Sequence, residues 1–172
     1  MSDQAEVSSL VNSGFLAKTQ SFYADIADFH TKFVLEYGGE PRELEDDMSL
    51  FRIGFMVEEL AEYSQSAGFM NVAQTLNELH EAIKEKKRWI VNRSDKGRSL
   101  ELQFDSLIDL TYVALGTSYL HGVDFDEGWR RVHAANMKKV RVENLADSKR
   151  NSKFDVVKPR GWTPPDLSDL VK

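Results

Sequence analysis

The stretch Leu100–His121, LELQFDSLIDLTYVALGTSYLH, decides the fold class of this chain. It is the most apolar segment of the sequence, and it contains no proline that would interrupt a helix. Gly122 follows directly and is expected to end the helix. Because a helix this apolar is normally covered by other elements, we expect it to lie buried at the centre of a bundle.

Four further helices are predicted around this central one. Apolar residues recur three and four positions apart over 18–36, 43–67, 71–91 and 125–142, which is the helical period. On the second of these helices the predicted apolar face consists of Leu50, Ile53, Val57, Leu60 and Ser64. Gly68 is expected to stop that helix, and Asp124 to cap the last one. The sequence therefore predicts an all-α fold, an antiparallel bundle of about five helices.

The whole chain, 1–172, is expected to be a single domain, with a flexible segment at 1–17 and an irregular C-terminal tail at 143–172. Its net charge of −6 argues against a protein that coats a nucleic-acid polymer. Basic residues nevertheless gather from Lys138 onward, which suits a small polyanion. The absence of cysteine excludes disulfides, thiolate catalysis and a zinc site that contains cysteine. No segment has the length and apolarity of a membrane span or a secretion signal, so a cytoplasmic protein is expected.

Three glutamates, Glu58, Glu59 and Glu62, share one side of the second predicted helix, within an arc of about 100°. Side chains of like charge repel one another there, so a cation between them would stabilise the cluster. The alternative is an acidic face that is simply solvated.

Two aspartates, Asp105 and Asp109, are the only charges between Gln103 and Leu120 of the most apolar helix. A charged carboxylate in a helix expected to be buried needs a partner, which is either a metal ion or a basic side chain. Five carboxylates converge if this helix packs beside the one with the glutamates. Oxygen ligands without histidine or thiolate favour Mg²⁺ or Mn²⁺. A di-iron bundle is not expected, because the chain contains no Glu-x-x-His motif.

Four motifs in this order resemble the all-α NTP pyrophosphohydrolase superfamily, which includes MazG, dimeric dUTPases and phosphoribosyl-ATP pyrophosphohydrolase. They are Phe29-His30-x-x-Phe33, Val57-Glu58-Glu59-Leu60-Ala61-Glu62, Asp105-Ser106-Leu107-Ile108-Asp109-Leu110-Thr111-Tyr112 and Val132-His133-x-Ala135-Asn136-Met137-x-Lys139. The tail from Phe154 to Asp166 is similar to that of bacteriophage MazG-like members, in which case the compartment is the host cytoplasm.

The resemblance implies a function and a role for each residue. It implies Mg²⁺-dependent hydrolysis of a nucleoside triphosphate between the α and β phosphates, giving a nucleoside monophosphate and pyrophosphate. By this resemblance Glu58 handles the attacking water, and dGTP is one substrate to consider. Mn²⁺ is expected to substitute for Mg²⁺, and the chain to form a homodimer or homotetramer. The metal ligands would be Glu59, Glu62, Asp105 and Asp109, and the phosphate-binding residues Asn136, Lys139, Arg150 and Lys153.

Several alternatives stay open at this point. Many members have Glu-x-x-Asp where this chain has Asp105-x-x-x-Asp109, so Glu101 is a further ligand candidate. The longer connection at 71–99 is compatible with a base pocket, with a role in oligomerisation or with no function. Trp162 either closes over a ligand or fixes the tail to the bundle. A different class of function is a non-catalytic helical assembly or binding protein with a structural acidic ion site.

Overall fold

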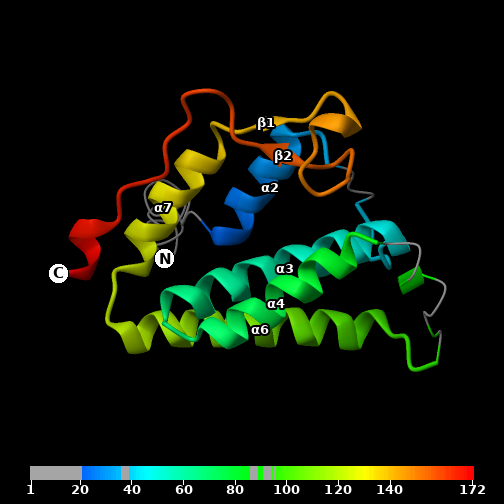
Figure 1. Ribbon diagram of the computed structural model, residues 1–172, viewed down its shortest axis with the longest axis horizontal. Helices are drawn as coiled ribbons and strands as arrows, with labels where there is room; N and C mark the ends of the chain where they lie inside the picture. The colour runs from blue at the N-terminus through cyan, green and yellow to red at the C-terminus, as the bar shows by residue number, and fades with distance from the viewer. Residues whose placement is uncertain (1–20, 36–38, 86–88, 91–93, 95) are drawn as a thin grey trace, which may run out of the picture.

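A computed structural model describes residues 21–35, 39–85, 89–90, 94 and 96–172. The expected flexible segment at 1–17 lies outside these described residues. Within them, the α-helices are α2 (Phe22–Lys32), α3 (Asp46–Ser66), α4 (Met70–Ile83), α6 (Leu100–His121) and α7 (Phe125–Asn136) (Figure 1). After α7 the chain forms two strands, β1 (Val140–Arg141) and β2 (Val156–Val157), and two 3₁₀ helices, η1 (Leu145–Asp147) and η2 (Ser168–Val171). The predicted all-α class is confirmed.

The helices α3 and α4 form an antiparallel pair and contribute half of the buried side chains among the described residues. Gly68, at a φ of 86°, makes the turn between them, as predicted. Two small residues, Ala61 and Ala73, are 1% and 2% exposed, which lets the helices approach closely. The predicted apolar face of α3 is wrong in part, because Ile53 and Leu60 are 43% and 52% exposed. The buried positions of α3 are instead Phe51, Gly54, Ala61 and Ser64.

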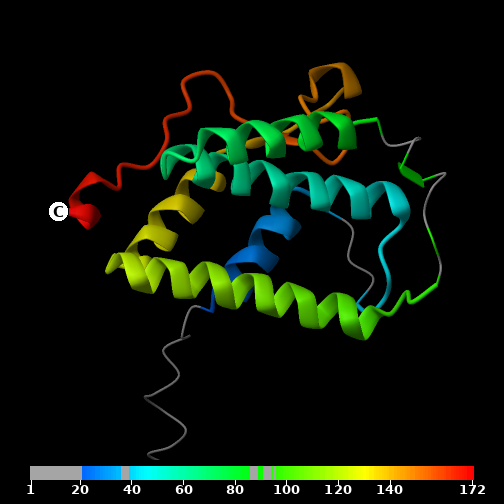
Figure 2. The ribbon, with the colours of Figure 1, turned by 60° about the horizontal axis from the view of Figure 1, so that its bottom comes forward.

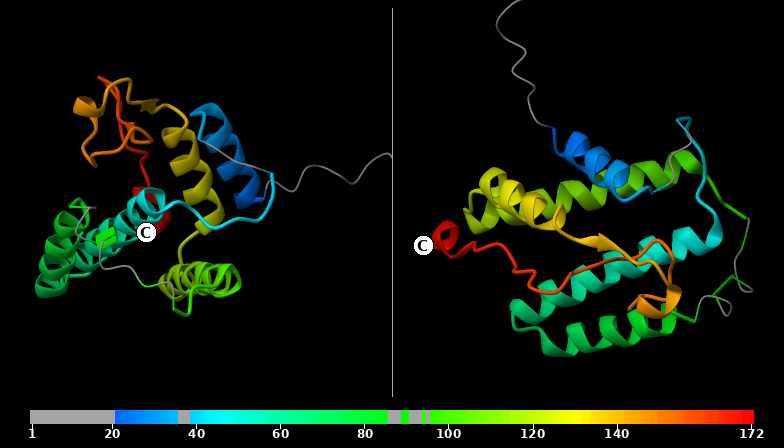
Figure 3. Two further views of the ribbon diagram at one scale, coloured as in Figure 1. Left: turned by 90° about the vertical axis from the view of Figure 1, so that its right-hand side faces the viewer. Right: turned by 90° about the horizontal axis from the view of Figure 1, so that it is seen from above.

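The helices α2 and α7 lie side by side (Figure 3), and aromatic rings pack between them. The ring of Phe22 lies 5.4 Å from that of Phe125 and 4.8 Å from that of Trp129. Trp129 also donates its indole N–H to the buried carboxylate of Asp25, at 2.8 Å. Asp124 caps α7 by accepting from the backbone N–H of Glu127, as predicted.

The most apolar helix, α6, does not lie at the centre of the described chain. It begins and ends where the sequence predicts, and Gly122 ends it in the left-handed conformation at a φ of 70°. Yet none of its residues is buried, and Tyr119 and Leu120 are 83% and 85% exposed. Figures 2 and 3 show α6 apart from the α3–α4 pair. The prediction of a central, buried helix is therefore wrong for a single chain.

The tail is more regular than predicted. The helix predicted over 125–142 ends at Asn136, and the strand β1 follows it, paired antiparallel with β2. Trp162 donates its indole N–H to the carbonyl of Ala135 at 2.9 Å, so this tryptophan fixes the tail to α7. The helix predicted over 71–91 is also shorter, because α4 ends at Ile83. Among the described residues, no helix is both long enough and apolar enough to span a membrane.

Candidate active site

The three glutamates lie in the C-terminal half of α3, as predicted. Glu58 is half-buried, whereas Glu59 and Glu62 are exposed. Partial desolvation, and then repulsion from Glu62 and Glu58, raise the pKa of Glu59 above its ordinary value. Two cations, Lys139 and Arg150, act on Glu59 in the opposite direction. The three glutamates thus form a concentration of negative charge that Lys139 and Arg150 only partly offset.

Arg150 reaches from the tail to Glu58 and binds it with two hydrogen bonds. Its Nε donates to Glu58 Oε2 and its Nη2 to Glu58 Oε1, each at 2.9 Å. The guanidinium also lies over the ring of Phe55, 4.5 Å from the ring centre. A planar guanidinium that binds both carboxylate oxygens fixes the plane of that carboxylate. Glu58 is therefore held in one orientation.

Asp155 holds the other side of the same guanidinium. Its carboxylate is 0% exposed, and Oδ1 accepts from Arg150 Nη1 at 3.1 Å. It also accepts from the hydroxyl of Ser148 and from the backbone N–H groups of Lys149 and Val156. These contacts stabilise the buried carboxylate, because an arginine pairs with it and hydrogen bonds satisfy both of its oxygens.

Lys139, three residues after the end of α7, faces the same region. Burial, and then repulsion from Lys158 and Arg150, lower its pKa, while attraction to Glu59 and Asp155 opposes that shift. Asn136 is the last residue of α7 and half-buried. Lys153, the remaining predicted phosphate ligand, lies over the ring of Phe154, 5.0 Å from its centre. The structure thus brings Lys139 and Arg150 to the glutamates and gives Lys153 a different neighbour.

The two aspartates of α6 are exposed and lie away from this cluster. Among the residues that the structure describes, no three acidic, histidine or cysteine side chains come close enough together to hold a metal ion, and no ion pair includes Asp105 or Asp109. Glu101, in the first turn of α6, is exposed as well. The five predicted carboxylates therefore do not converge within the described single chain. The donor type still fits a hard divalent cation, since carboxylate oxygens repel one another at Glu59 and a cation would offset that repulsion.

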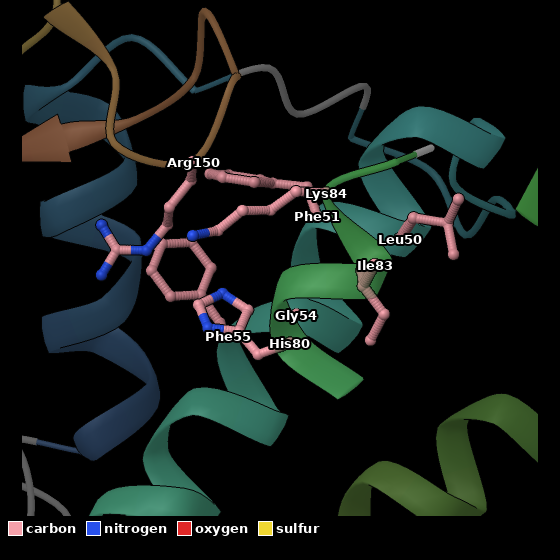
Figure 4. A pocket seen from close by; sticks show the side chains of 8 residues that line it. All are labelled: Leu50, Phe51, Gly54, Phe55, His80, Ile83, Lys84 and Arg150. Atoms are coloured by element: carbon pink, nitrogen blue, oxygen red, sulfur yellow. The ribbon is translucent and has the colours of Figure 1, made fainter. Parts of the chain in front are cut away.

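A small, open pocket lies between α3 and α4, and Arg150, the partner of Glu58, is part of its lining (Figure 4). Arg150 is shared between the pocket and Glu58, and Gly54, one turn before Glu58, forms part of its wall. A Cβ at Gly54 would meet the rings and methyl groups of the opposite helix, His80 at 3.7 Å and Ile83 at 3.6 Å. The lining combines apolar and cationic side chains: Leu50, Phe51, Gly54, Phe55, His80, Ile83, Lys84 and Arg150.

Two residues of the site, Phe55 and Asp155, were not predicted from the sequence. No periodic pattern predicts that Phe55 belongs to the site, because its contact with Arg150 depends on the tail reaching α3. Asp155 had a weak signal, a single carboxylate between Phe154 and the apolar pair Val156-Val157. An acidic residue inside such a short apolar run is compatible with a buried, paired carboxylate.

The helical architecture, with a carboxylate cluster faced by Lys139 and Arg150, fits a helical hydrolase of phosphate-containing substrates. Residues 26–136 match the family model of phosphoribosyl-ATP pyrophosphohydrolase. The chain belongs to this family, and so to the all-α NTP pyrophosphohydrolase superfamily that its motifs resemble. The family implies a pyrophosphohydrolase that acts on a nucleotide-like substrate, in a group whose members generally depend on a divalent metal. No curated protein and no solved structure matches the chain.

Proposed function

We propose that this protein is a Mg²⁺-dependent nucleoside triphosphate pyrophosphohydrolase that cleaves between the α and β phosphates. The observation that carries the proposal is the α3 cluster of Glu58, Glu59 and Glu62, faced by Lys139 and Arg150. Carboxylates can hold a cation and accept a proton from water, while the two basic side chains can bind phosphate oxygens. Both parts are needed to hydrolyse a triphosphate without a covalent intermediate.

In the proposed reaction a water oxygen forms a bond to the α phosphorus. The bond from that phosphorus to the bridging oxygen of the β phosphate breaks, and pyrophosphate leaves. Glu58 accepts the proton of the water, because Arg150 occupies one lone-pair position on each of its oxygens and a carboxylate has others available. The metal, when bound by Glu59 and Glu62 with Asp105 and Asp109, would supply charge stabilisation at the phosphates.

Phosphate binding in this proposal falls to residues near the tail. Lys139 is attracted by Glu59, and three of the five N–H groups of Arg150 are used by Glu58 and Asp155. The remaining donors of Arg150 would bind a phosphate oxygen. Asn136, one turn before Lys139, and Lys153 are the other proposed phosphate ligands.

For the base, we propose a purine deoxynucleotide, with dGTP as the first to test. The pocket beside Glu58 offers phenyl rings and the donors Lys84 and Arg150 (Figure 4). The ammonium of Lys84 complements the O6 and N7 acceptors of guanine, while the remaining donors of Arg150 bind phosphate. This complementarity supports the choice of guanine over bases that present a donor at that edge.

We also propose that a second copy of the chain covers α6, in a homodimer or homotetramer. Ten large apolar side chains of α6 are more than a third exposed, and a patch of this kind on one helix is typical of an interface. They are Leu102, Phe104, Leu107, Ile108, Leu110, Tyr112, Val113, Leu115, Tyr119 and Leu120. Association would also enclose Asp105 and Asp109, which lie on this helix.

The test of the proposed function is pyrophosphate release over a panel of ribonucleoside and deoxynucleoside triphosphates, with Mg²⁺, with Mn²⁺ and with a chelator. We expect metal-dependent release of pyrophosphate and monophosphate, with dGTP among the best substrates. Absence of release across the whole panel would contradict the proposal. Release with a different base preferred would contradict only the choice of dGTP.

A further inference from the structure

The side chain of Arg150 connects the tail loop between η1 and β2 to Glu58 of the α3 cluster. This guanidinium contacts Glu58 with Nε and Nη2, Asp155 with Nη1 and the ring of Phe55 with its face. The nitrogen atoms Nε, Nη1 and Nη2 of Arg150 each donate a hydrogen bond to a carboxylate. Both carboxylates together determine where the guanidinium lies.

Asp155 is the more rigid of these two carboxylates. It is 0% exposed, and four different groups donate to it: Arg150 Nη1, Ser148 Oγ and the backbone N–H groups of Lys149 and Val156. Its own backbone is fixed as well, because its carbonyl accepts from the N–H of Val142 at 3.1 Å. A side chain anchored at so many points does not move freely, whereas Glu58 is half-buried on the surface of α3. The anchored carboxylate of Asp155 thus fixes where the Arg150 guanidinium lies, and this guanidinium in turn holds the carboxylate of Glu58.

We infer that Asp155 is a positioning residue: through Arg150 it fixes the carboxylate of Glu58 in the orientation that hydrolysis requires. This inference rests on the proposed function for its effect on turnover. Asp155 and Arg150 both lie beyond residues 26–136, where the family match ends. The contact between Asp155 and Arg150 therefore belongs to the tail of this chain and lies outside the part that matches the family model.

The first experiment measures the link without using catalysis. In wild-type protein the Arg150 Nε–H, bonded to Glu58, is expected to give a resolved and slowly exchanging side-chain signal in ¹H–¹⁵N spectra. Asp155→Asn removes the charge that holds Nη1 while keeping a side chain of the same size. We expect faster exchange and a shifted Nε–H signal in this variant. An unchanged Arg150 signal in folded Asp155→Asn protein would overturn the inference, whether or not any nucleotide is hydrolysed.

The second experiment measures turnover and separates positioning from a general loss of structure. Asp155→Asn is expected to lower kcat by roughly tenfold to a hundredfold with little change in KM, the usual effect of removing a group that orients a functional side chain. The same substitution made in Arg150→Ala protein should have no further effect on kcat, because the link is already broken. An equal loss in both backgrounds would overturn the inference, since it would show that Asp155 acts by supporting the fold.

A matched control is available elsewhere in the tail. Asp169 also binds an arginine of the bundle with both oxygens, Arg131 at 2.5 and 2.9 Å, but this pair is not connected to Glu58. Asp169→Asn removes another aspartate–arginine contact of the tail, at a more exposed carboxylate, and is expected to leave both kcat and the Arg150 signal unchanged. If Asp169→Asn lowers kcat as much as Asp155→Asn does, loss of any tail anchor accounts for the effect and the inference is overturned. Failure of the proposed function would instead appear as absence of turnover in wild-type protein, with the Arg150 signal still responding to Asp155→Asn.

Discussion

The helices α3 and α6 are almost equal in length, 21 and 22 residues, yet the less apolar of the two is the one that packs within the chain. α3 buries Phe51, Gly54, Ala61 and Ser64, whereas α6 buries no residue. The difference lies in the distribution of apolar side chains. α4 follows α3 after a short turn and covers one face of it, whereas the apolar residues of α6 point in several directions and exceed what α7 covers. Hydrophobicity therefore indicates that a helix will be covered, but not by which chain.

The residues of the proposed site are also divided between α3 and α6. α3 gathers carboxylates with Arg150 and Lys139, so half of the proposed site is present in the described chain. α6 carries the other two proposed ligands, Asp105 and Asp109, on its exposed surface. The proposed hydrolysis therefore requires carboxylates from both helices, of which the described single chain brings together only those of α3.

The largest effect is expected when a carboxylate is removed from either helix. Glu58→Gln on α3 is expected to lower kcat by about 10²- to 10⁴-fold, the usual contribution of a general base, and Asp109→Asn on α6 to fall in the same range. Steady-state pyrophosphate release measures both. Glu78→Gln on α4 is the control and should leave kcat unchanged, because Glu78 bonds only Gln74 among the described contacts. Full activity in Asp109→Asn would show that α6 has no part in the site.

The next effect concerns association through α6. Val113 is 66% exposed, and Val113→Glu would place a charge in the proposed interface. Burying a valine contributes about 1.5 kcal/mol, so two copies in a symmetric dimer predict a dissociation constant at least about 100-fold weaker. Sedimentation velocity over a concentration series measures it. Val171→Glu, in η2 and 69% exposed, is the control and should associate like wild type. A wild-type chain that is monomeric at all concentrations contradicts the proposed interface.

A smaller effect is expected on the free energy of unfolding, which compares how tightly α3 and α6 are packed within the chain. Ala61 of α3 is 1% exposed against α4, so Ala61→Leu should overpack the pair and lower the free energy of unfolding by about 1 to 3 kcal/mol. Ala114→Leu on α6, introduced into the Val113→Glu background to keep the chain monomeric, should change it by less than about 0.5 kcal/mol, as at other surface positions. Urea unfolding of each variant and its parent gives the values. Equal losses at the two positions would mean that α6 is packed within the single chain.

The smallest effect is the pH dependence of Glu59. Its raised pKa means that the folded state binds the proton more tightly than the unfolded state, so the charged form destabilises the fold. This cost is fully present above the raised pKa and disappears below the ordinary value of 4.5. Glu59→Gln removes the desolvated charge and its repulsion from Glu62, so it should raise the free energy of unfolding at neutral pH by about 0.2 to 0.5 kcal/mol and leave it unchanged below pH 4.5. Urea unfolding across this range, without divalent metal, measures it; a loss of stability at neutral pH would show that Glu59 is salt-bridged instead.

Local signals in the sequence were sufficient for the elements but not for their packing. The bounds of α6, the turn at Gly68 and the cap at Asp124 follow from residues next to each helix end, and the structure confirms them. The burial of α6 was predicted wrongly, because one sequence does not specify which chain covers an apolar helix. The strand β1 was missed because two paired residues leave no periodic pattern.

The site divides in the same way. The glutamates share a face of α3 by helix geometry alone, so they could be predicted from spacing. Arg150 and Lys139 follow from the basic shift in the tail and from the family resemblance, and the structure places both beside the cluster. Phe55 and Asp155 become part of the site only through the path of the tail across α3, and that path is a long-range feature that local patterns do not encode.

The proposed reaction is tested most directly by hydrolysis of dGTP in ¹⁸O-labelled water with Mg²⁺, followed by mass analysis of the products. We expect monophosphate and pyrophosphate in equal amounts, with the ¹⁸O atom in the monophosphate, because water attacks the α phosphorus. Label in the pyrophosphate would place the attack on the β phosphorus. Formation of a diphosphate and labelled inorganic phosphate, or of no product from any nucleotide in the panel, would contradict the proposed reaction.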